Sequence, residues 1–196
     1  MYKKVIKRIL DFLIALMATP FVLLVVIILA PFIYFYDKGP IFYNAERCGK
    51  NGKNFKMFKL RSMYVNAPDI RNDDGSTYSS DDDIRVTPIG KFMRKTSLDE
   101  LPQVLNVLIG DMSIVGPRPT LPLDEKAEKD QERIIRNSVR PGITGYAQAY
   151  FRNSIDASEK FYYDNIYVKN ISFVLDLKII LKTVCSVFLR QNINTN

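Results

Sequence analysis

The residues best suited to chemistry in this chain are two adjacent carboxylates, Asp99 and Glu100, at the start of the segment 95–119. The chain contains no histidine. Carboxylates are therefore the leading candidates for nucleophile, general base and metal ligand. A structural alternative exists, because Ser97 and Glu100 match the S-x-x-E capping box, in which both side chains only close the start of a helix.

Pro102 favours a different start for that helix. Inside a helix beginning at Leu98 its ring would clash one turn back, whereas it suits the first position of a helix that begins at Pro102 itself. Asp99 and Glu100 would then precede a helix N-terminus, where the dipole favours negative charge by about 0.3–1 kcal/mol. An ionised Asp99 can bind Mg²⁺ or attack phosphorus.

Four arginines in otherwise turn-like sequence are candidates for binding phosphate: Arg94, Arg118, Arg140 and Arg152. Arg118 lies between two prolines, which stiffen the backbone around a planar, bidentate donor. For any one of them alone, simple exposure to solvent is the default. Their occurrence together with an acidic pair and an apolar segment is what favours phosphate.

The composition suits one domain, or a domain with an anchor: 196 residues, of which 47% are hydrophobic and 25% charged. The net charge of +7 suggests an anionic partner, such as nucleic acid, a phosphorylated metabolite or an anionic bilayer. Cys48 and Cys185 have no metal-binding spacing, so we interpret both as packing residues of a reducing compartment.

An apolar stretch without charged side chains, residues 12–36, is long enough to span a bilayer as a helix. Pro20 lies within it and removes a backbone hydrogen bond, while Thr19 can bond back to a carbonyl and accommodate a bend. Basic residues dominate both flanks, and positive flanks mark the cytoplasmic side. A re-entrant helix broken at Thr19-Pro20 is therefore about as well supported as a straight span. Asp11 is expected at the interface, beside Lys7 or Arg8.

The remaining pattern is mixed. Residues 40–43 and 55–60 are typical of strands, and the turn residues 49–52 between them predict a hairpin. Residues 66–83 predict a solvated surface loop, in which the aspartates 81–83 are too close in sequence to converge on one ion. Helices are expected over 90–95, 102–108, 123–137, 158–168 and 176–189, the last either in the core or in the membrane interface.

Together these features resemble the monotopic phosphoglycosyl transferases, also called bacterial sugar transferases, in the short form with only a hairpin and a catalytic domain. The chain departs from the family pattern at Ala45, where glutamine is common, and at Thr19, where serine often precedes the proline. The resemblance rests on Lys7-Arg8, Asp11, the apolar stretch interrupted before Pro20, and residues 47–52, 55–63, 97–103, 106–108, 110–119, 140–145 and 175–178.

The resemblance implies a predominantly helical α+β fold. Residues 1–36 would form a re-entrant helix–break–helix anchor, and residues 37–196 a catalytic domain on the cytoplasmic face of the bacterial inner membrane, with a small β-hairpin and interfacial amphipathic helices. The family moves a sugar 1-phosphate from a UDP-sugar to polyprenol (undecaprenyl) phosphate and releases UMP. This reaction is the first membrane step in assembling a glycoprotein, capsule, O-antigen or exopolysaccharide.

The same resemblance implies roles for individual residues. Asp99 would be the nucleophile that forms a covalent phosphosugar intermediate, Glu100 its acidic partner, and Mg²⁺ would bind near Asp99. Arg94, Arg118 and Arg152 would bind phosphate, with Arg140 a weaker candidate. Nucleic acid is not an expected partner. The sugar and the oligomeric state stay open, a homodimer being one option.

Two other functions compete with this one. A membrane-tethered, basic, non-catalytic module that binds lipid or nucleic acid would explain the charge but not the acidic pair. A one-step transferase, in which Asp99 only binds metal, would keep the same residues with a different mechanism.

Overall fold

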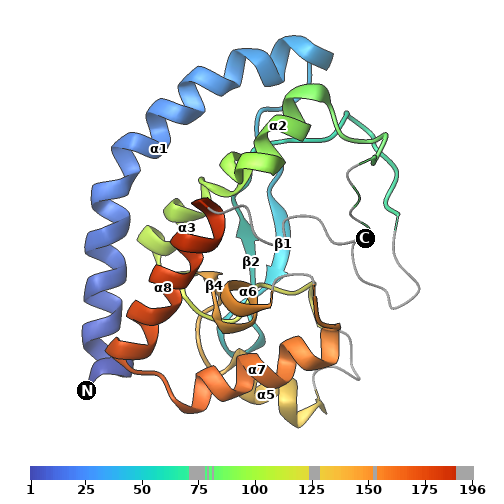
Figure 1. The fold of residues 1–196 in the computed structure, drawn as a ribbon. Helices are drawn as coiled ribbons and strands as arrows, with labels where there is room; N and C mark the ends of the chain where they lie inside the picture. The colour runs from blue at the N-terminus through green and yellow to red at the C-terminus, as the bar shows by residue number, and fades with distance from the viewer. Residues whose placement is uncertain (71–77, 79, 81, 124–128, 152–153, 189–196) are drawn as a thin grey trace. The chain divides into compact units, whose positions relative to one another are not determined.

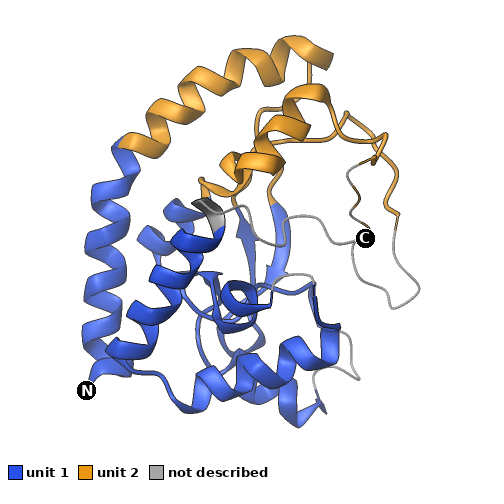
Figure 2. Ribbon diagram, viewed as in Figure 1, with its two compact units in different colours: residues 1–20, 45–57, 103–196 blue, residues 21–44, 58–102 orange. Residues whose placement is uncertain are grey.

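The computed structural model describes residues 1–70, 78, 80, 82–123, 129–151 and 154–188 (Figure 1). It forms two compact units (Figure 2). Unit 1 comprises Met1–Pro20, Ala45–Met57 and Gln103–Asn196, and unit 2 comprises Phe21–Asn44 and Phe58–Pro102. Helices predominate, and the described strands form two-stranded sheets, so the expected class, predominantly helical α+β, is confirmed.

The longest helix, α1, runs from Lys7 to Asp37 and follows a π-helical turn at Tyr2–Ile6. Within the described part of the chain, Tyr2–Asp37 is the helical stretch long and apolar enough to cross a membrane. Large apolar side chains stay exposed along it, among them Met17, Ile27 and Phe35. Such exposure on a continuous helix suits a lipid environment better than contact with water.

The expected break at Thr19-Pro20 is corrected by the structure, because helix α1 continues through both residues. What remains is a weakened turn. Pro20 has no N–H to donate one turn back, and the Thr19 hydroxyl donates to the carbonyl oxygen of Ala15 at 2.7 Å. Helical structure is therefore uninterrupted at Thr19-Pro20, and the re-entrant course of this helix through the membrane stays a prediction.

The β-hairpin lies in unit 1 and turns where the sequence predicts. Strand β1, Ala45–Cys48, pairs antiparallel with strand β2, Asn54–Met57. The turn between them contains a 3-10 turn at Lys50–Gly52. The first strand begins at Ala45 and not over residues 40–43 as expected. Ala45 and Cys48 bury their side chains, whereas Phe42 and Tyr43 are exposed. Phe42 makes an isolated bridge to Leu60 in unit 2 instead.

The core of unit 1 is built on two short parallel strands, β3 (Ser113–Val115) and β4 (Gly142–Thr144). Its buried centre is Val115, Ala149, Tyr167, Val168 and Ile179. The helices of this unit are α3 (Gln103–Ile109), α5 (Gln131–Asn137), α6 (Tyr146–Tyr150), α7 (Ala157–Lys169) and α8 (Phe173–Phe188).

The helical predictions hold for α7 and α8. Cys185 on α8 is exposed, so the predicted packing role of this thiol is wrong. The helix expected over 123–137 is found from Gln131 to Asn137, and residues 124–128 of that prediction lie outside the described residues. A capping box between Asp156 and Glu159 starts α7. Local signals therefore place these helices well.

Unit 2 packs the second half of α1 against helix α2, Pro88–Thr96. Leu29 and Ile33 of α1 meet Leu60 and Met93 in a small buried cluster. Helix α2 was expected over 90–95, and Thr87 caps its start by accepting from the backbone N–H of Gly90. This cluster supports the segment that carries the acidic pair.

Candidate functional site

Asp99 lies in unit 2 on a 3-10 turn, Leu98–Glu100, and is only 2% exposed. The backbone N–H of Leu60 donates to its carbonyl oxygen at 2.9 Å. Ser97 closes helix α2 with a left-handed backbone, φ 57°, and its side chain makes no capping bond to the following turn. The capping-box alternative is therefore wrong here, and helix α3 begins after the pair, at Gln103, as Pro102 predicts.

Lys59 is the cation paired with this centre, and the sequence analysis did not single it out. Its Nζ lies 2.8 Å from Asp99 Oδ2 and 3.6 Å from Glu100 Oε1. The first contact is a close ion pair, and Oδ2 has no other hydrogen-bond partner within the described residues. The available signal was the position of Lys59 beside Leu60 in the 55–63 motif.

Arg94 is held close to the same centre by helix α2. Its Nε donates to Ser62 Oγ at 3.0 Å. Burial lowers the pKa of Arg94, while the carboxylates of Asp99, Asp83 and Glu100 oppose that shift. The helix approaches the Ser62 backbone so closely that a Cβ on Gly90 would lie 1.9 Å from the Ser62 carbonyl oxygen. Glycine at this position is what lets α2 bring Arg94 to the site.

Unit 2 also contains a buried ion pair between a carboxylate and an arginine. Arg85 Nη2 is 2.7 Å from Asp83 Oδ2, and both side chains are buried. Hydrogen bonds from Arg85 lower the pKa of Asp83. The prediction that the aspartates 81–83 are all solvated is therefore wrong for Asp83, whose side chain is buried and paired with Arg85. Asp82 is exposed, and Asp81 lies outside the described residues.

The other candidate arginines belong to unit 1. Arg118 is exposed after β3, and Arg140 is half-buried with its Nε donating to the Gly110 carbonyl oxygen at 2.7 Å. Arg152 lies outside the described residues. The structure thus brings Arg94 together with Asp99 and Glu100 in one unit.

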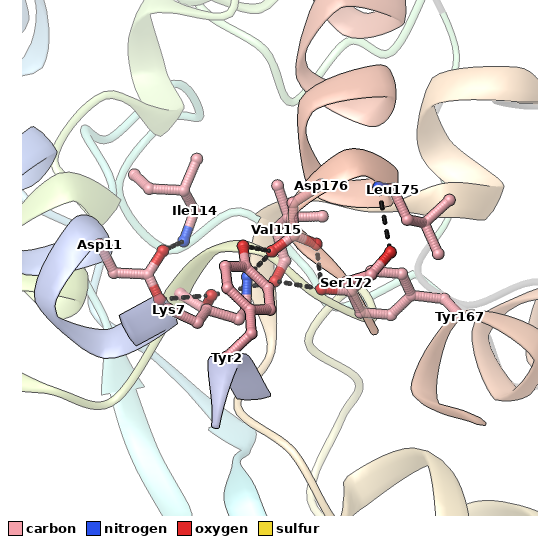
Figure 3. A network of polar contacts seen from close by, with 10 residues as sticks. Tyr2, Lys7, Asp11, Ile114, Val115, Tyr167, Ser172, Leu175 and Asp176 are labelled. Atoms are coloured by element: carbon pink, nitrogen blue, oxygen red, sulfur yellow. Dashed lines mark hydrogen bonds and ion pairs between the residues drawn. The ribbon is translucent and has the colours of Figure 1, made fainter. Parts of the chain in front are cut away.

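The N-terminal anchor residues are held within unit 1 by specific partners (Figure 3). Asp11 is buried and, one helical turn after Lys7 and Arg8, lines the same cavity as they do, while its carboxylate bonds to strand β3. It accepts hydrogen bonds from Ser113 Oγ, at 2.7 Å, and from the backbone N–H of Ile114, at 3.1 Å. These two bonds satisfy the buried Asp11 carboxylate and the edge of strand β3, and its expected place at the membrane interface stays a prediction.

Asp176 on α8 collects the other contacts of this segment. Lys7 Nζ lies 2.7 Å from Asp176 Oδ2, and the hydroxyl groups of Tyr2 and Tyr167 donate to the same carboxylate (Figure 3). Arg8 donates to the carbonyl oxygens at the end of α3, those of Val107 and Leu108. Cations at a helix C-terminus are favoured by its dipole and its unpaired carbonyls.

The fold and the site together indicate a protein that binds an anionic group beside a membrane. A long apolar helix begins a chain in which a buried carboxylate, a second carboxylate, a lysine and an arginine converge. Such a centre suits an anionic group that must be bound and exchanged beside a membrane.

Comparison with known proteins identifies the family. The family model described as bacterial sugar transferase matches residues 2–190, and the chain belongs to this family. It is 39% identical over 195 residues to the UDP-glucose:undecaprenyl-phosphate glucose-1-phosphate transferase of Klebsiella pneumoniae, covering 96% of this chain and 41% of the relative. It is 38% identical to the exopolysaccharide production protein ExoY of Sinorhizobium fredii over 196 residues, covering 94% and 86%.

A third relative carries a different sugar in its name. The chain is 39% identical over 188 residues to the UDP-N-acetylgalactosamine-undecaprenyl-phosphate N-acetylgalactosaminephosphotransferase of Aeromonas hydrophila, covering 91% of this chain and 43% of the relative. The chain thus spans about two fifths of the length of the Klebsiella and Aeromonas proteins. Similar identity to relatives named for different sugars means that overall similarity does not select a donor.

Proposed function

We propose that this chain moves a sugar 1-phosphate from a UDP-sugar to polyprenol phosphate, with release of UMP, as the first membrane step of a bacterial glycoconjugate. The observation that carries the proposal is Asp99, a buried carboxylate paired with Lys59 and adjacent to Glu100 and Arg94. Names of the relatives support a sugar phosphate donor and an undecaprenyl phosphate acceptor.

The reaction proceeds in two displacements at one phosphorus atom. A carboxylate oxygen of Asp99 attacks the phosphorus that carries the sugar. The bond from this phosphorus to the oxygen of UMP breaks, and UMP leaves with that electron pair. A phosphate oxygen of polyprenol phosphate then attacks the same phosphorus, the bond to Asp99 breaks, and the carboxylate is regenerated. Lys59 and Arg94 offset the negative charge of the diphosphate, which would otherwise repel the attacking carboxylate.

Mg²⁺ fits the residues of this centre. Asp99 Oδ2 is buried and has no hydrogen-bond partner within the described chain besides the Lys59 ammonium group, and the Glu100 carboxylate is adjacent in sequence. Mg²⁺ commonly takes one or two carboxylates from a protein and completes its shell with substrate phosphates and water. Held by Asp99 and Glu100, the ion would neutralise diphosphate charge.

The activity test is UMP release from a panel of UDP-sugars with polyprenol phosphate and Mg²⁺. We expect Asp99→Asn to lower the rate by a factor of about 10³ or more, since it removes the nucleophile. Asp82→Asn, a change of the same type at an exposed carboxylate, serves as the control. Wild-type rates in Asp99→Asn would refute the assignment, and no UMP release from any donor would favour a non-catalytic, anion-binding module.

The two-step mechanism has its own test. Ping-pong initial-rate kinetics and a phosphosugar adduct on Asp99, trapped without the acceptor, are expected. Intersecting kinetics with no adduct would mean a one-step transfer in which Asp99 only binds metal.

We further propose that α1 enters and leaves the cytoplasmic face of the inner membrane without crossing it. Basic residues on both flanks support this topology. Cysteines introduced at exposed Val5 and Tyr43, in a Cys185→Ser background, report on the flanks. We expect a membrane-impermeant thiol reagent to label both from the cytoplasmic side only, whereas labels on opposite faces would establish a span.

A further inference from the structure

A cavity of about 490 Å³ lies entirely within unit 1. Its wall is strongly basic, with Asp11 as an acidic member, and it is formed by segments far apart in sequence. The basic side chains that line it are Lys3, Lys4, Lys7, Arg8, Lys50 and Arg140. Bringing so many like charges together around one space raises the potential inside it, which favours an anionic occupant.

The internal contacts of these cations orient them but leave most of their charge uncompensated. Lys7 is paired with Asp176. Arg8, Arg140 and Lys3 donate to backbone carbonyl oxygens, which carry no net charge. Asp11 is itself committed to the edge of strand β3. The cavity therefore keeps a net positive charge after every contact inside the protein is considered.

Lys4 and Lys50 stand out among the lining residues. Both are exposed, and within the described chain neither ammonium group makes a hydrogen bond or an ion pair. Lys50 comes from the turn of the β-hairpin and Lys4 from the N-terminal turn. Two ammonium groups on different elements are thus available to one ligand, and binding it would break no contact inside the described part of the protein.

The rest of the wall combines the hydroxyl groups of Ser113, Ser138 and Tyr167 with apolar side chains, and large apolar side chains are exposed on the neighbouring segments. Val115, Val139 and Ile171 line the cavity with the cations. The same N-terminal segment exposes Val5, Ile6 and Ile9, and α8 exposes Phe173 and Val174. An occupant with a phosphate and an apolar chain satisfies both parts of this environment, whereas a nucleotide or free phosphate leaves the apolar surface uncovered.

We propose that this cavity binds the phosphate-bearing headgroup of a membrane lipid and so fixes the N-terminal end of α1 at the bilayer surface. Lys4 and Lys50 contact the phosphate, while Lys7, Arg8 and Arg140 set the potential around it. The proposal does not rest on the transfer reaction, because no step of that reaction is needed for lipid binding. Two lipids share the required chemistry: an anionic glycerophospholipid and a polyprenol phosphate.

The test is native mass spectrometry of the full chain in detergent micelles, with phosphatidylglycerol, polyprenol phosphate or phosphatidylcholine added in separate titrations. We expect at least one of the two anionic lipids to bind about tenfold or more tighter than phosphatidylcholine. Each basic side chain near an anionic surface contributes a factor of roughly five. Lys50→Gln and Lys4→Gln should therefore each weaken anionic lipid binding about fivefold, and together about 25-fold.

Matched controls separate a site from general charge. Lys53→Gln and Lys169→Gln remove exposed lysines of the same unit that do not line the cavity, and they should leave lipid affinity unchanged. Lys50 lies outside the N-terminal basic segment, so its variant tests the cavity without altering that flank of α1. The relative affinities for phosphatidylglycerol and polyprenol phosphate identify which lipid is the occupant.

Three results would overturn the proposal: wild-type lipid affinity in the Lys4→Gln/Lys50→Gln variant, equal weakening by the control variants, or displacement of the lipid by UDP or inorganic phosphate at comparable concentration. The last would assign the cavity to a soluble anion. Lipid binding should persist in Asp99→Asn, so failure of this proposal and failure of the proposed reaction are distinguishable.

Discussion

The ion pair between Lys59 and Asp99 makes the sharpest prediction about stability. At the observed 2.8 Å, two unit charges attract by about 6 kcal/mol for an effective dielectric constant of about 20. The Lys59 side chain is 21% exposed against 3% for Asp99, so removing the lysine leaves an almost fully buried carboxylate unpaired. Loss of one partner of a buried pair typically costs about 3–5 kcal/mol. Lys59→Met should therefore lower Tm by about 6–20 °C.

The assay is thermal unfolding of the full chain in micelles, followed by circular dichroism, with EDTA present so that divalent metal does not replace the ammonium group. Lys56→Met, on the exposed side of β2, is the matched control and should leave Tm unchanged. Adding Asp99→Asn to Lys59→Met should restore most of the lost stability, since no buried charge then lacks its partner. A Lys59→Met chain that melts within about 1 °C of wild type would refute this account.

Three further predictions follow from close contacts elsewhere. Gly90→Ala should destabilise unit 2 by at least about 1–3 kcal/mol, measured by thermal unfolding, because its Cβ would overlap the Ser62 carbonyl oxygen. Tyr167→Phe should cost about 1–3 kcal/mol in the same assay, because its buried hydroxyl donates its one proton to the Asp176 carboxylate at 2.8 Å, with the Val115 carbonyl oxygen as a second, longer acceptor at 3.1 Å. A result under about 0.3 kcal/mol would contradict that bond. Hydrogen bonds from Arg85 lower the pKa of Asp83, so the unfolded chain binds that proton more readily; the stability from this pair is present above about pH 4 and is lost as the pH falls below it. Asp83→Asn should flatten the dependence of Tm on pH in that acid range.

Features with a local cause were predictable from the sequence. Pro102 cannot lie inside a preceding helix, and the structure begins α3 at Gln103. The hairpin turn at residues 49–52 follows from its glycines, and Gly52 adopts φ +77°. Asp99 was singled out from residue type and neighbours alone, and it proves to be buried and paired. Each of these signals acts within a few residues.

Features that depend on distant partners were missed or misplaced. Asp11 bonds to Ser113, 102 residues later, so its burial has no local signature. Lys59 was counted only as one of many flanking charges, because its carboxylate partner comes from another segment. Asp83 looked like part of a solvated acidic run, and its arginine two residues later became informative only when both side chains were seen to be buried. Pairing, rather than residue type, decides these roles.

The arginines show why this distinction matters for function. Among the described residues the buried arginines are Arg61, Arg85 and Arg136, and each donates several hydrogen bonds inside the protein. Their acceptors are Asp37 and two carbonyl oxygens for Arg61, Asp83 and two carbonyl oxygens for Arg85, and Asp164 and the Arg118 carbonyl oxygen for Arg136. A guanidinium that binds substrate phosphate must be fixed by one contact and keep others for the ligand. Arg94, held through Nε by Ser62 beside Asp99, meets that requirement. Replacing Arg94 with lysine would keep the charge but lose the planar, bidentate donor, so we expect UMP release to fall while Tm stays near wild type. Arg85→Lys should do the reverse, lowering Tm first.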